Sequence, residues 1–415
     1  MVMIQLGYST SGLTNLNLFQ AIEAVEEAGF SGIELSLHKE QFNPFQISNQ
    51  ELARLKKELK KRNIKPACIN SATFFFQPER PHDPSLICID LAGRKQRIHL
   101  IKEAIRLAKI LEVPIVSCGS GFIRDEHLMN PLVDPESLLI DSIYQCVEDC
   151  GDVVLVIEPE PGMYIETLEQ GVNLVKKVNL ESFRLHIDLC HAFCSDGDYI
   201  EAIRQAAAYT KYLHVSDTSD GYNLKVITFK EDIFCNLNFA SYLIYFPETA
   251  NFLFIDRECI FYFYDRLLSD VEKLEIERFA QKFNENTVQY IDYNQLYMGP
   301  SSYESEIKVY AISIPNISWC IIDRVKPIVN YLKTTKSDRT HKYIIEKKVA
   351  NTLTGKVHFH ELPGTGQIDF TACFNALKEK GFYGYAVVEL YHHVDIWKET
   401  LQQSFSYLSK CLEPE

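Results

Sequence analysis

Short apolar segments alternate with amphipathic ones along the first 217 residues and again near the end of the chain. The apolar runs have the length of buried strands, and the amphipathic segments have the apolar spacing of helices. The expected strands are Ile4–Tyr8, Gly32–Ser36, Lys65–Asn70, Val113–Ser117, Val153–Glu158, Phe183–Asp188, Lys211–Val215 and Tyr385–Glu389. Eight strands that alternate with helices predict a parallel sheet closed into a (β/α)8 TIM barrel. An open doubly wound sheet is the alternative, although it usually needs fewer strands.

A long segment of different character interrupts this alternation between the seventh and eighth strands. Residues 219–356 are rich in Tyr, Phe, Ile and Asn and carry 17 Lys and Arg against 18 Asp and Glu. A helix is expected at Val271–Phe283, and strands are expected at Lys308–Ile314 and Ser318–Ile322. These elements predict a small α/β insertion domain in the loop after strand seven, with residues 1–218 and 357–415 forming the barrel. Its role, as a lid or as a passive decoration, stays open.

Four of the predicted strands end in a side chain that can bind a metal ion. Strands five to eight end in Glu158, Asp188, His214 and Glu389. Catalytic residues of TIM barrels gather at these strand ends, and consecutive strands are neighbours, so the four side chains can meet at one point. Three carboxylates and one imidazole suit one divalent ion, such as Mn, Mg, Co or Zn. Each residue alone has an ordinary structural explanation, but their shared register favours a metal site.

The composition argues against several other classes of protein. The net charge of −14 and the sequence pI of about 5.4 disfavour binding to nucleic acid or to an anionic membrane. The first residues lack the basic and apolar regions of a secretory signal, and the uncharged stretch Ile233–Pro247 is too short to cross a bilayer. The twelve cysteines form no CxxC pair, which is typical of reduced thiols. We therefore expect a cytoplasmic protein with a small-molecule partner, and a homo-oligomer is left open.

Several phrases of the sequence resemble those of one known family. They are Gly29–Glu34, Val156–Glu158, Ile187–His191, Tyr212–Asp217, Val387–Glu389 and, as the most specific, Leu362-Pro-Gly-Thr-Gly-Gln-Ile-Asp-Phe370. On these residues the chain resembles the sugar phosphate isomerase/epimerase group of xylose isomerase-like TIM barrels, which also contains endonuclease IV. The resemblance covers about residues 3–217 and 357–412.

The resemblance implies a single divalent metal ion whose ligands are Glu158, Asp188, His214 and Glu389. It also implies that His191 touches a substrate oxygen, and it makes His360 and Asn70 further substrate-binding candidates. A metal that chelates a carbonyl and the adjacent hydroxyl acidifies the C–H bond between them and stabilises an enediolate. Glu158 and Glu389 are then the candidate base and acid, and Glu160 is a weaker alternative.

The sequence departs from the endonuclease IV pattern at several positions. Such members need further His ligands after strands three and four, where this chain has Asn70 and the turn Ser117–Gly121. An Asp-x-His after strand seven is replaced by His358-Phe-His360. We therefore expect an isomerase or epimerase of a sugar, sugar phosphate or polyol-type substrate that carries a carbonyl. An inosose-dehydratase-like lyase is the near alternative, an AP-endonuclease-like hydrolase is more distant, and a non-enzymatic binding protein is least favoured.

Overall fold

The computed structural model describes residues 4–71, 75–77, 82–218, 224–228, 241–246, 251–255, 260–264, 268–280, 288–292, 358, 360–391 and 393–413. The chain divides into two compact units, Met1–Thr218 with His358–Glu415 and Ser219–Val357. Among the helices so described, none is both long and apolar enough to span a membrane. Each unit is treated by itself below.

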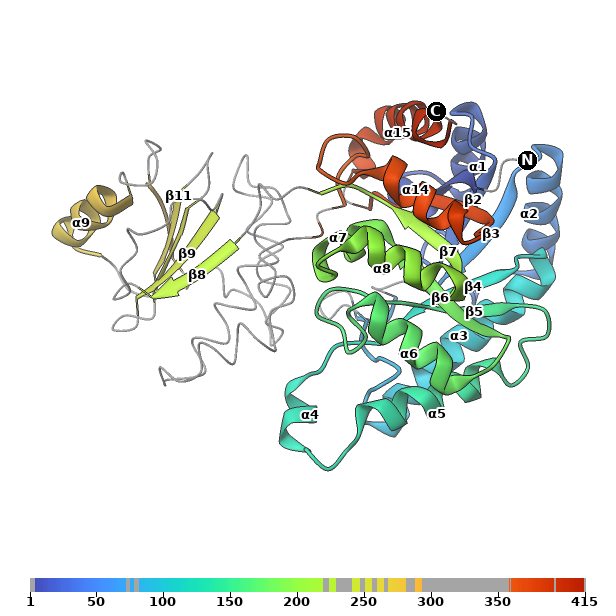
Figure 1. Cartoon of the computed structure of the whole chain (residues 1–415), viewed down its shortest axis with the longest axis horizontal. Coiled ribbons are helices and arrows are strands. Elements are labelled where there is room, and N and C mark those ends of the chain that lie inside the picture. The colour runs from blue at the N-terminus through green and yellow to red at the C-terminus, as the bar shows by residue number, and fades with distance from the viewer. Residues whose placement is uncertain are drawn as a thin grey trace. The chain divides into compact units, whose positions relative to one another are not determined.

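The first unit is a closed barrel of eight parallel strands, so the predicted TIM barrel is confirmed (Figure 1). Around the barrel the order is β1-β13-β7-β6-β5-β4-β3-β2, which is the chain order expected for this fold. The strands are β1 (Ile4–Ser9), β2 (Gly32–Ser36), β3 (Lys65–Asn70), β4 (Ile115–Gly119), β5 (Val154–Glu158), β6 (Phe183–Asp188), β7 (Thr210–Val215) and β13 (Gly384–Val388).

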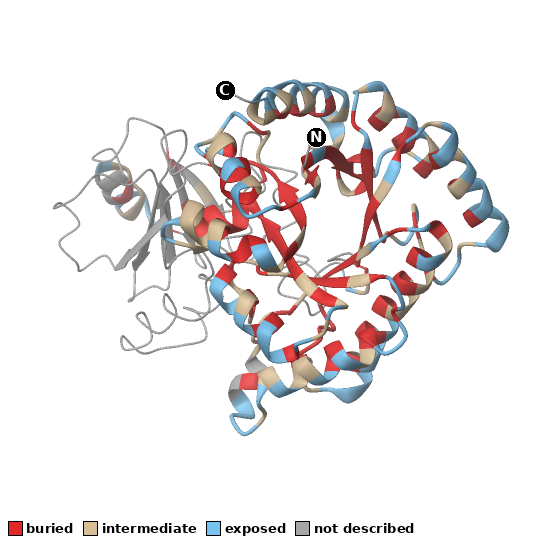
Figure 2. Cartoon of the chain, turned by 45° about the vertical axis from the view of Figure 1, so that its right-hand side comes forward, coloured by how far each residue is buried: buried red, intermediate tan, exposed pale blue. Residues whose placement is uncertain are grey.

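Helices surround the strands, with buried residues on the side that faces the barrel (Figure 2). Helix α2 shows the reason, since Leu52, Leu55 and Leu59 are buried on one face while Lys and Glu cover the other. The α-helices of this unit are α1 (Leu18–Glu27), α2 (Asn49–Lys61), α3 (Leu91–Leu111), α4 (Asp125–Met129), α5 (Pro135–Val147), α6 (Leu168–Val178), α7 (Leu189–Ser195), α8 (Tyr199–Ala206), α14 (Phe370–Glu379) and α15 (Trp397–Leu412). Short 3-10 helices cover Thr10–Leu13, Ala207–Tyr209 and Val394–Ile396.

The apolar core has two parts because strand side chains alternate between the two faces of the barrel wall. The larger part lies between strands and helices and includes Ile33, Leu155 and Leu213. A smaller cluster joins strands from different sides of the barrel and therefore lies inside it. Its members are Ala67, Cys68, Val156, Tyr212 and Val387, with Ile115, Val154 and Tyr385 packed against them. This inner cluster closes the barrel beneath the strand ends that carry Glu158 and His214.

The chain after Asp188 passes directly from strand β6 into a helix. Helix α7 begins at Leu189, and Asp188 is its N-cap. The Oδ1 atom of Asp188 accepts hydrogen bonds from the backbone N–H groups of Cys190 (2.7 Å) and His191 (3.1 Å). A carboxylate that caps the first turn starts a helix as well as ending a strand, and the strand-end pattern alone did not distinguish the two outcomes. The cap fixes His191 relative to Asp188.

Asp217 holds together the two chain segments that flank the second unit. It forms an isolated antiparallel bridge with Glu361, and its buried carboxylate accepts hydrogen bonds from the N–H groups of Gly364 (2.8 Å), Gly366 (3.0 Å) and Ile368 (3.2 Å). A Cβ atom on Gly366 would lie 2.2 Å from the Thr218 carbonyl oxygen, so only glycine fits. The Pro-Gly-x-Gly phrase thus wraps around one carboxylate.

The second unit contains a five-stranded sheet of order β12-β11-β10-β9-β8. Its described elements are β8 (Leu224–Thr228), β9 (Ser241–Phe246), β10 (Asn251–Ile255), β11 (Ile260–Tyr264), α9 (Asp270–Ala280) and β12 (Val288–Asp292). Helix α9 overlaps the expected helix Val271–Phe283. The expected strands Lys308–Ile314 and Ser318–Ile322 lie outside the described residues. We propose that this unit is a separate insertion domain.

Replacing Asp217 by Ala should lower the free energy of unfolding by about 3 kcal/mol, because several buried N–H groups would lose a charged acceptor. The Asp198→Ala variant is a matched control, since Asp198 caps α8 through one exposed hydrogen bond and should cost only about 1 kcal/mol. Urea unfolding followed by circular dichroism measures both. Equal losses in the two variants would contradict the role assigned to Asp217.

Asp196 follows α7 and accepts a hydrogen bond from the Leu168 N–H group at the start of α6 (3.2 Å). Burial raises the pKa of Asp196 to about 7, against that hydrogen bond, and the charges of Glu166 and Glu169 add to the rise. Because this pKa is raised in the folded protein, protonated Asp196 stabilises the fold. That contribution is complete below the unfolded pKa of about 4 and is lost as the pH rises through about 7.

The Asp196→Asn variant should therefore lose less thermal stability than the wild type between pH 5 and pH 8. The amide cannot ionise, yet its oxygen can still accept the hydrogen bond. Melting temperatures across this pH range test the expectation, with Asp152→Asn as an exposed control that should follow the wild type. A parallel pH dependence in wild type and Asp196→Asn would show that Asp196 does not titrate in this range.

Candidate functional site

The four predicted metal ligands lie together at one end of the barrel. Glu158 and Asp188 are the last residues of β5 and β6. His214 is the second-to-last residue of β7, and Glu389 directly follows β13. The Nδ1 atom of His214 lies 3.3 Å from Glu158 Oε1, 3.5 Å from Glu389 Oε2 and 3.9 Å from Asp188 Oδ2. One imidazole nitrogen thus faces three carboxylates that come from three different strands.

The other nitrogen of His214 binds a fourth carboxylate, that of Glu34 on β2. His214 Nε2 lies 2.8 Å from Glu34 Oε2, and both side chains are fully buried. Glu34 also accepts hydrogen bonds from the hydroxyl groups of Tyr212 (2.8 Å) and Ser9 (2.7 Å). A proton on Nε2 that is donated to Glu34 leaves Nδ1 to face the three strand-end carboxylates.

Burial and neighbouring charges set the ionisation of this group. Burial opposes the charge on His214, but Glu34, Glu389 and Glu158 raise its pKa well above the usual value. Burial likewise opposes ionisation of Glu34, whose pKa is nevertheless lowered by His214 and by its hydroxyl donors. For Glu389, burial raises the pKa well above the usual value, and Glu158 and Glu34 add to the rise against His214. The raised pKa values of His214 and Glu389 both reflect several carboxylates crowded around one imidazole.

The donor atoms fit a divalent cation. One oxygen of Asp188 caps α7, and within the part of the chain that the structure describes, its buried Oδ2 atom has no hydrogen-bond partner. Four ligands placed tetrahedrally about 2.1 Å from an ion lie roughly 3.4 Å apart, close to the separations of 3.3, 3.5 and 3.9 Å measured from His214. An oxygen without a partner, in an excess of buried carboxylates, is what a bound cation would satisfy.

Sequence reasoning gave no role to Glu34 or to His186. His186 on β6 places Nδ1 2.8 Å from the Ser117 hydroxyl and 3.5 Å from Glu158 Oε2. Burial, with the nearby His214 and His191, lowers the pKa of His186 well below the usual value, so the ring is neutral. Both residues could have been found from strand alternation, because His186 shares a barrel face with Asp188 and Glu34 is a charged residue inside an apolar strand.

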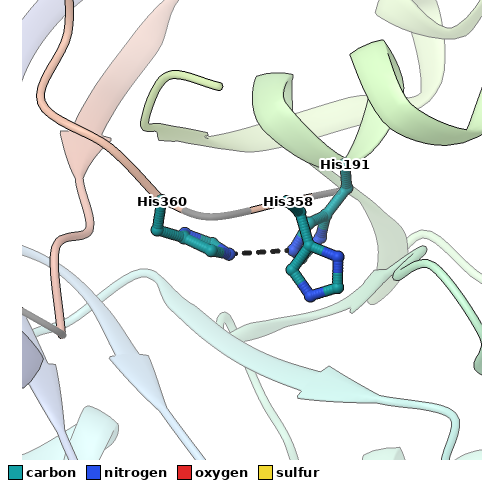
Figure 3. A group of neighbouring side chains, drawn as sticks. All are labelled: His191, His358 and His360. Atoms are coloured by element: carbon teal, nitrogen blue, oxygen red, sulfur yellow. Dashed lines mark hydrogen bonds between the residues drawn. The ribbon is translucent and has the colours of Figure 1, made fainter. Parts of the chain in front are cut away.

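His191 and His360, both predicted to bind substrate, face each other across 3.2 Å between their Nε2 atoms (Figure 3). His191 Nδ1 lies 3.2 Å from the Pro159 carbonyl oxygen and therefore carries a proton, so its Nε2 accepts. His360 then donates from Nε2 and accepts at Nδ1 from the Ser216 hydroxyl, 3.0 Å away. His358 stands edge-on to His191, with ring centroids 4.8 Å apart. The two predicted residues thus form one hydrogen-bonded pair.

Asn70, the third predicted substrate residue, ends β3 beside Glu34. Its Nδ2 atom lies 3.5 Å from Glu34 Oε1, and its side chain is partly exposed. Asn70 therefore belongs to the same strand-end layer as the proposed metal ligands, on the side of the buried Glu34.

The closed barrel, with its layer of polar side chains at the strand ends, defines a TIM-barrel protein. Comparison with known proteins agrees with this fold. The model of the xylose isomerase-like TIM barrel family matches residues 22–241, and the chain belongs to this family. The inosose isomerase of Bacillus velezensis is 24% identical over 210 residues, which cover 50% of this chain and 70% of that protein.

Solved structures of low sequence identity share the fold. A D-tagatose 3-epimerase-like protein matches with a TM-score of 0.55 at 13% identity, covering 99% of this chain and 100% of its own. The IOLI protein, solved with a bound zinc atom, matches with a TM-score of 0.51 at 17% identity, covering 99% of this chain and 98% of its own. At these identities the likeness concerns the fold alone.

Proposed function

We propose that this protein is a divalent-metal-dependent isomerase or epimerase of a polyhydroxy substrate, and that it reacts at the carbon next to the substrate's carbonyl group. The observation that carries the proposal is the arrangement around His214, where one nitrogen binds Glu34 and the other faces three carboxylates. The similarity to an inosose isomerase supports a sugar-like or cyclitol-like substrate, and a bound zinc atom in a protein of the same fold supports a metal.

Glu158, Asp188, His214 and Glu389 are the residues that would hold the ion. When bound, the ion would polarise the substrate carbonyl and a neighbouring hydroxyl, which acidifies the C–H bond between them. The identity of the metal among Mn, Mg, Co and Zn is not fixed by three carboxylates and one imidazole.

Glu158 and Glu389 are the residues that we assign to proton transfer. Their side chains are 13% exposed, whereas those of Asp188 and His214 are fully buried, so the two glutamates are the ones open to an entering substrate. They come from β5 and β13, which are separated by β6 and β7 around the barrel. One carboxylate can remove a proton from carbon on one side of the substrate while the other returns a proton from the opposite side.

The His191–His360 pair is assigned to the substrate oxygens. Each ring is held by a second hydrogen bond, to the Pro159 carbonyl and to the Ser216 hydroxyl, which fixes the direction of the two Nε2 atoms. A substrate oxygen that replaces the contact between them would find one donor and one acceptor. Such a pair can orient a substrate through hydrogen bonds of fixed direction.

A lyase of the inosose-dehydratase kind is the second candidate, because removal of the same proton can also expel a β-hydroxyl group. The similarity to an enzyme named for inosose keeps this candidate open. An AP-endonuclease-like hydrolase is less well supported, since the described residues at the ends of β3 and β4 are Asn70 and Gly119 rather than histidines.

The direct test follows hydrogen exchange in D2O with the metal-loaded protein and a panel of ketohexoses and inososes. Loss of one proton signal beside the carbonyl is expected, together with appearance of an isomer that carries one deuterium at the exchanged carbon. A product lighter by one water would favour the lyase. Binding of metal with no exchange for any member of the panel would contradict the proposed function.

Replacing Glu34 by Gln should weaken metal binding about 10- to 100-fold, the usual effect of losing a carboxylate behind a ligating histidine. The fold should survive, because the amide keeps the shape of Glu34. Titration calorimetry with Mn²⁺ on EDTA-treated protein measures the affinity, and Glu169→Gln on the exposed face of α6 is the control. Unchanged affinity in Glu34→Gln would separate His214 from the metal site.

Replacing Glu158 or Glu389 by Gln should lower the rate of C–H exchange about 100- to 10,000-fold, because the amide cannot take up a proton. His191→Asn should instead raise KM about tenfold, since it removes one hydrogen bond to substrate and leaves the four ligands in place. Metal content by atomic emission accompanies the kinetics of each variant. Loss of the metal in His191→Asn would show that His191 is a ligand rather than a substrate contact.

A further inference from the structure

Three histidines meet beside the proposed metal ligands, and the proposed reaction uses only two of them. His191 lies in the first turn of α7, and His358 and His360 lie on the segment that precedes α14 (Figure 3). All three belong to the barrel unit, and one ring nitrogen from each lies within 4.8 Å of the other two. His191 and His360 are buried and His358 is half-buried, so the cluster reaches solvent at His358.

The two buried rings present their two nitrogen atoms to different neighbours. His191 Nδ1 lies 3.6 Å from Glu158 Oε1, and His360 Nδ1 lies 3.7 Å from Glu389 Oε2. The Nε2 atoms of the two rings instead face each other across 3.2 Å. An ion held by the Nε2 atoms would therefore occupy a place of its own, separate from the one that Glu158, Asp188 and Glu389 surround.

The hydrogen bonds behind the two rings allow both Nε2 atoms to act as ligands. His191 Nδ1 donates to the Pro159 carbonyl oxygen (3.2 Å), which leaves a lone pair on Nε2. His360 Nδ1 lies 3.0 Å from the Ser216 hydroxyl, which can either donate or accept. When His360 carries its proton on Nδ1, that hydroxyl accepts the hydrogen bond, and a second lone pair on Nε2 faces the first. Metal-binding histidines are usually held in this way, with the other ring nitrogen donating to an oxygen.

The spacing of the three rings suits a tetrahedral ion. Two ligand atoms about 2.1 Å from such an ion lie roughly 3.4 Å apart, close to the 3.2 Å between the Nε2 atoms of His191 and His360. His358 stands edge-on to both rings, with its centroid 4.8 Å from that of His191 and 5.5 Å from that of His360. Three imidazoles with a fourth position left for water are a known ligand set for zinc. His360 also has a φ of 50°, a strained value for a residue other than glycine that is typical of functional positions.

We propose that His191, His358 and His360 form a second cation site, which takes a borderline ion such as Zn²⁺ and lets that ion compete with the substrate. Imidazole nitrogens favour zinc, copper and nickel, whereas the three carboxylates around His214 also suit harder ions such as Mn²⁺ or Mg²⁺. An ion on the Nε2 atoms of His191 and His360 removes the donor and the acceptor that are assigned to substrate oxygens. The second site does not depend on the proposed function, but the competition rests on it.

The site is tested by titrating Zn²⁺ into EDTA-treated full-length protein, with calorimetry for the affinities and atomic emission for the zinc content. The wild type should bind two zinc ions per chain. His358→Phe should weaken one binding event by more than the roughly 100-fold that loss of an outer hydrogen-bond partner costs, because it removes a ligand itself, and should leave the other event unchanged. His99→Gln, on the exposed face of α3, is the matched control and should bind zinc as the wild type does. His358→Gln replaces His358→Phe if circular dichroism shows that the phenylalanine variant does not fold.

The competition is tested by C–H exchange in D2O with the same ketohexoses and inososes, using Mn²⁺-loaded protein with and without added Zn²⁺. With free zinc at about ten times its Kd for the second site, the apparent KM of the wild type should rise about tenfold, with kcat little changed. His358→Phe should show no such rise. Because Zn²⁺ can also replace Mn²⁺ among the carboxylates of either protein, only the difference between wild type and variant reports on the second site.

The outcomes separate the second site from the proposed reaction. One zinc ion per chain in the wild type, or two in both the wild type and His358→Phe, overturns the second site. Two in the wild type and one in His358→Phe, without exchange by either protein, supports the second site and contradicts the proposed reaction. An equal effect of Zn²⁺ on exchange by the two proteins overturns the competition.

Discussion

The hydrogen bond between His214 and Glu34 is the interaction on which the arrangement of the strand ends depends. It crosses the barrel interior from β7 to β2, and Tyr212 and Ser9 add donors from β7 and β1 to the same carboxylate. A fully buried carboxylate is costly unless charged or hydroxyl donors surround it, and Glu34 has three. These donors settle which nitrogen of His214 turns toward Glu158, Asp188 and Glu389.

The same alternation that folds the strands also separates the apolar interior from the polar layer. On β5 the inward residues Val154 and Val156 belong to the inner apolar cluster, and Glu158 follows two positions later. On β7 Tyr212 belongs to that cluster, and His214 is the next inward residue. The apolar layer keeps water away from the carboxylates above it, which strengthens every charge interaction in the site. The same alternation of side chains along the strands therefore forms both the inner apolar cluster and the polar site above it.

Most of the barrel and of the residues at its strand ends could be predicted from the sequence. The features that could not be predicted have physical reasons. Strand ends such as Glu158 and Asp188 could be predicted because a barrel gathers them at one face. The contact of Glu34 with His214 could not be predicted, because it depends on which side chains meet across the barrel interior. The alternation of residues along a single strand does not specify such a contact. Helix α7 could not be predicted from Asp188, because an aspartate that caps a helix and one that begins a turn look alike in the sequence.

The closure of the chain by Asp217 bears on how such proteins change over evolutionary time. Because Asp217 and the segment from Glu361 to Ile368 are already joined by hydrogen bonds, the chain between them begins and ends at a fixed junction. The entropy of closing a loop grows only with the logarithm of its length, so such a junction tolerates insertions of very different size. Descendants of one barrel can thus gain, lose or exchange a whole domain here while the reactive residues keep their places.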